Sequence, residues 1–281
     1  MRNRSHFCEY RPIARRVFAT LFAFAVGFAV TQPAAAVPID LGTAGGFAVL
    51  AGTTVTNTGP TVINGGNVGV SPGTALTGFA SVSGTFTTHS ANGVALQAQK
   101  DLTTAYNTAA GLTHTQDLTG FDLGGRVLVP GTYFFSSSAQ LTGKLTLDTL
   151  GNPDAQFVFQ IGSTLTTASD ASVVSLSGLD PLCAVFWQVG SSATLGTNTK
   201  FQGHIMALTS ITLNTGATIV AGSALARNGA VTLDRNTINN SMCDVTNVPD
   251  AGASTLVLAL GALFLLGAAK RARVTKPALD S

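Results

Sequence analysis

The stretch from Ala193 to Leu233 reads ATLGTNTKFQGHIMALTSITLNTGATIVAGSALARNGAVTL and contains one short pattern three times. The three copies are Ala193-Thr194-Leu195, Ile211-Thr212-Leu213 and Val231-Thr232-Leu233. In a β-strand the outer two residues of each triplet point to one side and the threonine points to the other. The copies recur about every 18 to 20 residues, the length of three strands of about six residues, so the pattern predicts a three-sided coil.

Two earlier triplets extend this series towards the N-terminus. They are Leu145-Thr146-Leu147 and Ser163-Thr164-Leu165, and a longer interval around Gly178 to Leu182 indicates an insertion. A second set of segments is apolar at both odd and even positions, so both of its faces are expected to be covered. These segments are residues 156–161, 184–189, 203–208 and 222–226.

One helix is predicted, over about residues 91–110. Val94, Ala98, Leu102 and Tyr106 recur there at four-residue spacing, which is typical of one face of an α-helix. This is the only segment of the exported part that could cover the doubly apolar strands. We therefore expect an all-β-dominated domain with one helix along one side and two sides open to water.

The first 36 residues have the layout of a secretory signal peptide. Arg15 and Arg16 precede an apolar run from Val17 to Val30, and Ala34 to Ala36 provide small residues for cleavage. A membrane anchor is the alternative, although the run is shorter than the ~20 residues that a spanning helix needs. The mature domain is expected to be residues 37–247.

The last segment, residues 248–281, mirrors the first. Val248, Pro249 and Asp250 are followed by an apolar stretch over 253–269 and then by Lys270 and Arg271. This order resembles the C-terminal sorting signals that exosortase-type enzymes process, of the PEP-CTERM or Val-Pro-Asp kind. It implies export through the inner membrane of a Gram-negative-type bacterium, with secretion or attachment at the outer surface. The expected partners of this end are the membrane or the processing enzyme, with the 253–269 helix cleaved or retained.

The charge of the mature part excludes one class of partner. Residues 37–247 hold six Lys or Arg against ten Asp and no Glu, although the whole chain has a formal charge of +2. A net negative domain argues against nucleic-acid binding. Cys183 and Cys243 are its only cysteines, so a disulfide between them is expected after export, with two buried free thiols as the alternative.

Several motifs in order resemble the DUF3494 ice-binding family. The motifs are Leu41-Gly42-Thr43-Ala44, Phe47-Ala48-Val49-Leu50, Val68-Gly69-Val70-Ser71-Pro72-Gly73, Ala98-Gln99-Lys100-Asp101-Leu102, Pro130-Gly131-Thr132-Tyr133, Phe157-Val158-Phe159-Gln160-Ile161-Gly162, Val185-Phe186-Trp187-Gln188-Val189-Gly190 and Gly229-Ala230-Val231-Thr232-Leu233-Asp234. The resemblance covers about residues 39–240. It implies a right-handed, discontinuous β-solenoid of triangular cross-section with a long helix alongside, and an ice crystal surface as the partner.

Threonine rows are the candidate ice-binding residues. The segment Thr215-Gly216-Ala217-Thr218 matches a Thr-Ala/Gly-x-Thr/Asn pattern that some members of the family carry. The first-choice face is the side that follows each triplet: Thr167, Thr197, Thr199, Thr215, Thr218 and Thr237. The second-choice face is the triplet row itself: Thr146, Thr164, Thr194, Thr212 and Thr232. Threonine is also simply favourable in exposed strands, and that alternative stays open.

Other functions are less well supported by the residues. A surface adhesin or structural spacer of the same fold is the main alternative to ice binding. A polysaccharide-cleaving solenoid would need paired carboxylates, and no pair of Asp residues recurs at the coil period, so we expect no enzyme activity. His89, His114 and His204 stand alone, without metal-binding spacing, so neither a metal nor a cofactor is expected.

Overall fold

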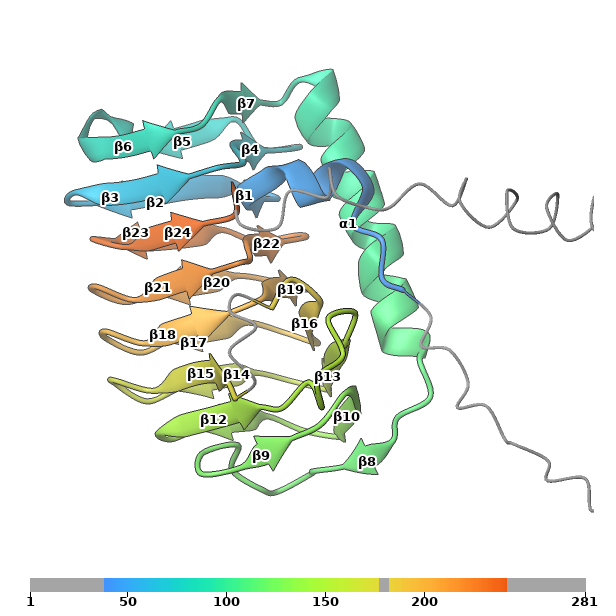
Figure 1. Ribbon diagram of the computed structural model, residues 1–281. Helices are drawn as coiled ribbons and strands as arrows, with labels where there is room; N and C mark the ends of the chain where they lie inside the picture. Colours follow the sequence, from blue (N-terminus) through green and yellow to red (C-terminus); the bar gives the residue numbers. More distant parts are fainter. Residues whose placement is uncertain (1–37, 177–181, 242–281) are drawn as a thin grey trace, which may run out of the picture. The chain divides into compact units, whose positions relative to one another are not determined.

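The computed structural model describes residues 38–176 and 182–241 (Figure 1). Their strands form three parallel sheets, and the chain visits the sheets in the order A, B, C in each complete coil. The first coil after the helix has strands only in sheets A and C and reaches sheet B through a single bridge between Asp122 and Gln140. A three-sided solenoid with one long helix is therefore confirmed. The predicted signal segment (residues 1–36), the sorting motif (Val248, Pro249 and Asp250), the apolar stretch 253–269 and Cys243 lie outside the described residues.

Each sheet is named here by a letter, and its strands are given in spatial order. Sheet A contains β7 (Thr88–Ser90), β4 (Asn67–Val70), β1 (Phe47–Ala51), β22 (Ala224–Ala226), β19 (His204–Ala207), β16 (Val185–Val189), β13 (Phe157–Ile161), β10 (Gly131–Phe135) and β8 (Gln116–Asp117). Sheet B contains β11 (Ala139–Leu141), β14 (Leu165–Thr167), β17 (Ala193–Leu195), β20 (Ile211–Leu213), β23 (Val231–Asp234), β2 (Thr54–Thr58) and β5 (Ala75–Thr77). Sheet C contains β6 (Val82–Thr85), β3 (Thr61–Asn64), β24 (Thr237–Asn239), β21 (Thr218–Val220), β18 (Lys200–Gln202), β15 (Ser172–Ser175), β12 (Lys144–Leu147) and β9 (Val127–Leu128).

The order of the coils along the stack differs from their order in the sequence. The first strands, β1, β2 and β3, pair with β22, β23 and β24, the last strands of the described chain. The chain then adds one more coil, β4 to β6, and ends that part at β7. It reaches the opposite end of the stack at β8 only after the helix, and from there it builds back towards β22. The solenoid is therefore discontinuous, as the family resemblance implied.

Helix α1 (Gly93–Gly111) connects the two ends of the stack and runs along sheet A in Figure 1. Its 19 residues extend about 28 Å at ~1.5 Å per residue, most of the way along nine strands spaced ~4.8 Å apart. The Asn92 side chain caps the first turn by accepting a hydrogen bond from the Ala95 amide at 3.0 Å. The structure places this helix over the sheet that carries the doubly apolar strands.

Two apolar layers hold the solenoid together. The inner layer is enclosed by the three sheets and includes Trp187, whose ring stacks on Phe159 with centroids 3.8 Å apart. The outer layer lies between sheet A and the helix, where Leu102 and Tyr106 pack with Phe186 and other outward-facing residues of the sheet. The central strands of sheet A, β1, β22, β19, β16 and β13, are therefore buried on both faces, whereas its end strands β7 and β8 are exposed. Sheets B and C each have one face open to water along the stack.

The turn from sheet B to sheet C has the same backbone form in successive coils. One residue in each turn has a positive φ, a conformation that glycine and asparagine adopt most easily. These residues are Gly143, Asp170, Asn198, Gly216, Arg235 and Gly59. Repetition of one corner geometry keeps the strands that precede it in register.

Candidate functional site

The outer face of sheet B, called face B below, carries one threonine in each of six consecutive coils. Strand pairing places each of these threonines directly beside the next: Thr166, Thr194, Thr212, Thr232, Thr56 and Thr77. Their neighbours within each strand point inward. These neighbours are apolar around Thr194, Thr212 and Thr232, whereas Thr166 and Thr56 are each followed by a buried polar residue, Thr167 and Asn57. We call this row the threonine ladder.

A second row of small side chains runs beside the ladder, two residues earlier in each coil. Thr164, Ser192 and Ser210 occupy this row, and their hydroxyl groups are held by hydrogen bonds. The Thr164 hydroxyl donates to the Ser138 hydroxyl at 2.8 Å, and the Ala230 amide donates to the Ser210 hydroxyl at 3.2 Å. In such a sheet, rungs are ~4.8 Å apart and alternate residues of one strand are ~6.6 Å apart, so the hydroxyl groups of these three coils form a regular two-dimensional grid. Ala230 and Ala75 occupy the second row in two of the other coils.

Face B is almost free of charge. The only ionisable residue within the strands of sheet B is Asp234, at the end of β23. Its carboxylate is neutralised locally, because Oδ1 lies 3.2 Å from the Arg235 guanidinium and Oδ2 accepts a hydrogen bond from the Thr215 hydroxyl. The outer face of sheet C differs, since it carries the exposed residues Lys144 and Lys200.

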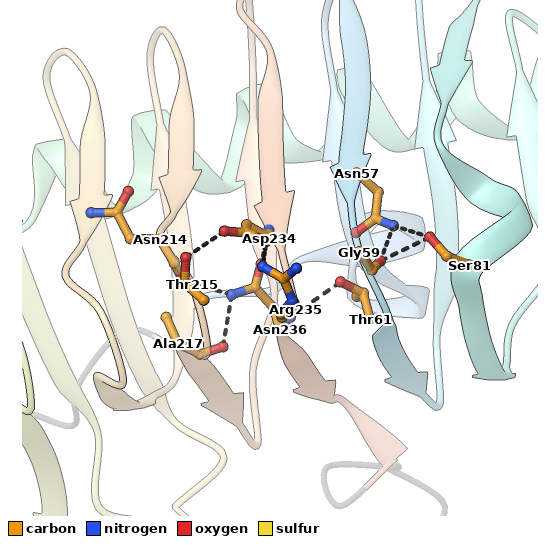
Figure 2. A network of polar contacts seen from close by, with 10 residues as sticks. All are labelled: Asn57, Gly59, Thr61, Ser81, Asn214, Thr215, Ala217, Asp234, Arg235 and Asn236. Carbon is orange, nitrogen blue, oxygen red and sulfur yellow. Dashed lines mark hydrogen bonds and ion pairs between the residues drawn. The ribbon is translucent and has the colours of Figure 1, made fainter.

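The corner between sheets B and C is fixed by buried polar side chains (Figure 2). Asn236 is almost fully buried, and its amide nitrogen donates to the carbonyl oxygens of Asn214 at 2.9 Å and Ala217 at 3.0 Å, both one coil away. The side-chain oxygen of Asn236 accepts a hydrogen bond from the backbone amide of Asp234. The backbone amide of Asn236 donates to the Thr61 hydroxyl in the coil on the other side. Three successive coils are therefore locked together at this corner.

Asn57 has a similar role one coil further along. Its side-chain nitrogen donates to the carbonyl oxygens of Gly59 and Gly78 and to the Ser81 hydroxyl, over distances of 2.8 to 3.1 Å. Figure 2 shows the contacts of Asn57 with Gly59 and Ser81 beside those of Asn236, along the same edge of face B. Because one edge of the face is tied to the interior in this way, the ladder is held rigid.

Two of the residues predicted for the first-choice face are inside the protein, so that part of the prediction is wrong. Thr167 and Thr199 are buried, and their hydroxyl oxygens lie 2.7 Å apart. The Thr167 hydroxyl also accepts a hydrogen bond from the Gly196 amide at 2.8 Å. These threonines supply the hydrogen-bonding groups of the corner and have no surface with which to contact a partner.

The other four residues of the first-choice face do not form one surface. Thr197 and Thr215 lie in the turns between sheets B and C, and Thr218 and Thr237 are neighbours on the outer face of sheet C. The six residues are therefore divided among the interior, a corner and a sheet that also carries lysines. The idea that they form one flat face is corrected accordingly.

The second-choice row is placed more consistently. Thr194, Thr212 and Thr232 are adjacent members of the threonine ladder. Thr164 precedes β14 and lies in the neighbouring row, whereas Thr146 belongs to sheet C and is buried, so it was wrongly included.

Three members of the ladder were not predicted from the sequence. Thr166 is one residue beyond the triplet that was chosen. Thr56 and Thr77 come from the N-terminal coils, which stack on the last coil only in three dimensions. Threonine at alternate positions in Thr54-Val55-Thr56 was the available signal for the first of these coils.

The remaining candidate groups are structural or isolated in the described part of the chain. His204 is buried, its Nδ1 lies 2.9 Å from the Ser223 hydroxyl, and burial lowers its pKa to about 4 although a hydrogen bond with the Cys183 backbone opposes this shift. Cys183 is disulfide-bonded. Over residues 38–176 and 182–241, no cluster of His, Cys, Asp or Glu could hold a metal ion, and no helix has the length and apolarity needed to span a membrane.

Comparison with known proteins agrees with this architecture. Residues 49–239 match the model of the family described as ice-binding-like. An ice-binding protein of Nostoc sp. (strain HG1) is 53% identical over 91% of this chain and 96% of its own length, and one of Colwellia sp. is 36% identical over 72% and 83%. The crystal structure of an ice-binding protein from an Antarctic biological consortium superposes with a TM-score of 0.70 at 47% identity, covering 74% of this chain and 93% of that one. This chain belongs to the ice-binding-like family.

Proposed function

We propose that this protein binds ice, and that it does so through face B. The observation that carries the proposal is the threonine ladder: six threonines from six stacked coils, in register, on a face that is almost free of charge and whose edge is fixed by buried hydrogen bonds. The names of the relatives support the same function, because the Nostoc and Colwellia proteins are both ice-binding proteins.

The chemistry of threonine suits this task. Its branched side chain has a restricted χ1 angle, so the hydroxyl and methyl groups are held in nearly fixed directions. A grid of such groups holds water molecules at the hydroxyls and around the methyls in a regular arrangement before the protein meets a crystal. Little conformational entropy is then lost when that water joins the ice lattice, because both the side chains and the backbone beneath them are already ordered.

The alternative of a surface adhesin or structural spacer is less favoured by this face. The strands of sheet B present no aromatic side chain outward over the six coils of the ladder, and a cavity lined by Gly65, Cys183 and Asn240 lies at the corner opposite face B. Small ligands and glycans usually need a concave site with convergent polar groups. A flat repeating lattice suits a flat repeating partner.

The proposal extends to where the protein works. Residues 1–36 direct export, and the segment 248–281, with Val248, Pro249 and Asp250 at its start, acts as a sorting signal read by an exosortase-type enzyme. The mature domain is then released or held at the outer surface. Its role is to contact ice outside the cell, and it is not an enzyme.

The direct test is the growth of a single ice crystal in a solution of the purified chain. Ice binding predicts faceted crystals and a gap between the melting and the freezing temperature that grows with protein concentration. The matched control is the same solution after the protein has been irreversibly unfolded. Round crystals without a temperature gap at high concentration would reject the function, whatever the fold.

A further inference from the structure

The corner between sheets C and A lies opposite face B, because the three sheets form the sides of a triangle. The described chain both enters and leaves at this corner. It enters through the 3₁₀ helix Gly42–Gly46, which precedes β1, and it leaves at Ser241, just after β24. Both segments line one cavity of about 530 Å³.

The exit is firmly fixed. The Asn240 amide donates to the Asn64 carbonyl oxygen at 2.9 Å, and its side-chain nitrogen donates to the Gly45 carbonyl oxygen at 2.9 Å. A side chain added at Gly65 would collide with Ser241, so the two backbones are closely packed there. The point from which the C-terminal segment departs is therefore part of the rigid solenoid.

Cys183 lines the same cavity as Ser241 and is disulfide-bonded. The other two cysteines of the chain are Cys8 and Cys243. Two residues beyond Ser241 reach up to ~7 Å, and a disulfide joins Cα atoms that are ~6 Å apart, so Cys243 is within range of a partner on another wall of the cavity. Cys8 lies in the predicted signal peptide, which leaves Cys243 as the partner.

We infer that a Cys183–Cys243 disulfide pins the C-terminal segment at the corner opposite face B, so that a protein attached through this segment presents face B away from the attachment surface. Forming the bond removes two protons and two electrons from the two thiols, and an oxidised dithiol of the export compartment accepts them. That the partner of face B is ice rests on the proposed function. The direction in which face B points does not depend on that function.

The linker is short enough for the direction to matter. Nine residues separate Cys243 from the apolar stretch that begins at residue 253. Nine residues of any conformation reach at most ~30 Å, and one six-residue side of the solenoid is itself ~20 Å wide. To lie with face B against the surface, this segment would have to use about two-thirds of its full reach of ~30 Å to pass around one side of the molecule.

Peptide mapping tests the disulfide. Trypsin without reduction should yield Leu145–Lys200 linked to Asn236–Lys270, because these peptides contain Cys183 and Cys243. Linkage of Cys183 to a peptide containing Cys8, or a Cys243 that alkylates without reduction, would overturn the assignment.

A labelling experiment tests the orientation without ice. The full chain carries a biotin-acceptor peptide after Asp250 and is captured on a flat streptavidin surface. One reporter cysteine is placed either on face B (Thr166→Cys) or at the exit corner (Gly46→Cys), where an added side chain meets no neighbour. A bulky maleimide should label Thr166→Cys at the same rate in captured and free protein, and Gly46→Cys several-fold more slowly after capture. Stronger protection at Thr166→Cys than at Gly46→Cys would overturn the orientation.

A measurement of adsorption to ice separates this inference from the proposed function. If the free chain shapes ice, the captured chain should adsorb to ice, and capture through biotin on Thr166→Cys should abolish that adsorption. Loss of adsorption after C-terminal capture of an active chain would contradict the orientation. Absence of ice shaping by the free chain would reject the proposed function, and the orientation would then be decided by the labelling rates alone.

Discussion

The hydroxyl oxygens of Thr167 and Thr199 lie 2.7 Å apart inside the corner between sheets B and C, one coil from each other. The Thr167 hydroxyl also satisfies the buried amide of Gly196. Threonine therefore has two separate roles in this solenoid: on face B it is presented to the outside, and at the corner it replaces missing backbone hydrogen bonds.

The first prediction separates these two roles. Thr167→Val keeps the shape of the side chain but leaves the Gly196 amide without an acceptor, which should cost about 1–3 kcal/mol of unfolding free energy. Below its unfolding temperature the variant should keep full ice activity. Thr197→Val, at a half-exposed turn position, is the control and should change stability by less than about 0.5 kcal/mol. Equal melting temperatures for both variants in calorimetry would show that the buried hydroxyl pair is not structural.

A second prediction concerns acid. Burial lowers the pKa of His204 to about 4 in the folded state, whereas an exposed histidine titrates near 6.5. Between these values the unfolded chain binds the proton more readily, so the stability from the neutral ring is complete above about pH 6.5 and is lost as the pH falls towards 4. The total loss should be on the order of 3 kcal/mol.

His204→Gln is the variant that tests this pH effect, because glutamine does not titrate and still offers polar groups towards Ser223. Its melting temperature should be lower at neutral pH but should change less than that of the native chain between pH 6.5 and 4. The lowered pKa values of Asp101 and Asp117 also remove stability as the pH falls, beginning about one unit above their ordinary value of 3.8, but both groups are present in the variant and in the native chain and cancel in the comparison. Parallel curves for variant and native chain would assign the acid sensitivity to other groups.

A third prediction follows from the proposed disulfide. In the chain-entropy model, closing a loop of this length stabilises the fold by roughly 4 kcal/mol. Cys183→Ser and Cys243→Ser should each lose this amount, and the double variant should lose no more than either single one. Unfolding in denaturant measures all three. An unchanged Cys243→Ser alongside a destabilised Cys183→Ser would mean that Cys183 has another partner.

The general architecture could be predicted from the sequence because it is periodic. Triplets such as Ile211-Thr212-Leu213 repeat at the coil length, and the apolar stripe of the helix matches strands that are apolar on both faces. Two inward apolar residues around one outward threonine were enough to predict a row such as Thr194, Thr212 and Thr232, although not what the row contacts.

The errors have two physical causes. Alternation along a strand continues to its last residue, so Thr167 points inward just as Leu165 does, and the corner then turns Thr199 inward as well. The second cause is the order of the coils. Thr56 and Thr77 join the ladder through pairing between strands that are far apart in the chain, which no local pattern reports.

A fourth prediction concerns charge on the face. Thr194→Lys places a hydrated ammonium group in the middle of the ladder, and this group disturbs the ordered water without affecting the core. Ice activity should fall sharply while the melting temperature changes by less than about 4 °C. Ser172→Lys on sheet C, between the existing Lys144 and Lys200, is the matched control and should keep its activity. Equal activity in the two variants would mean that face B does not contact ice.

The most direct test of the central claim compares freezing hysteresis in Thr212→Tyr and Thr218→Tyr at equal protein concentration. Both positions are half-exposed threonines in strands, but Thr212 lies in the middle of face B and Thr218 lies on sheet C. If face B binds ice, Thr212→Tyr loses most of the hysteresis and Thr218→Tyr retains it, with both variants folded. Retained hysteresis in Thr212→Tyr together with its loss in Thr218→Tyr would contradict the assignment of the ice-binding face.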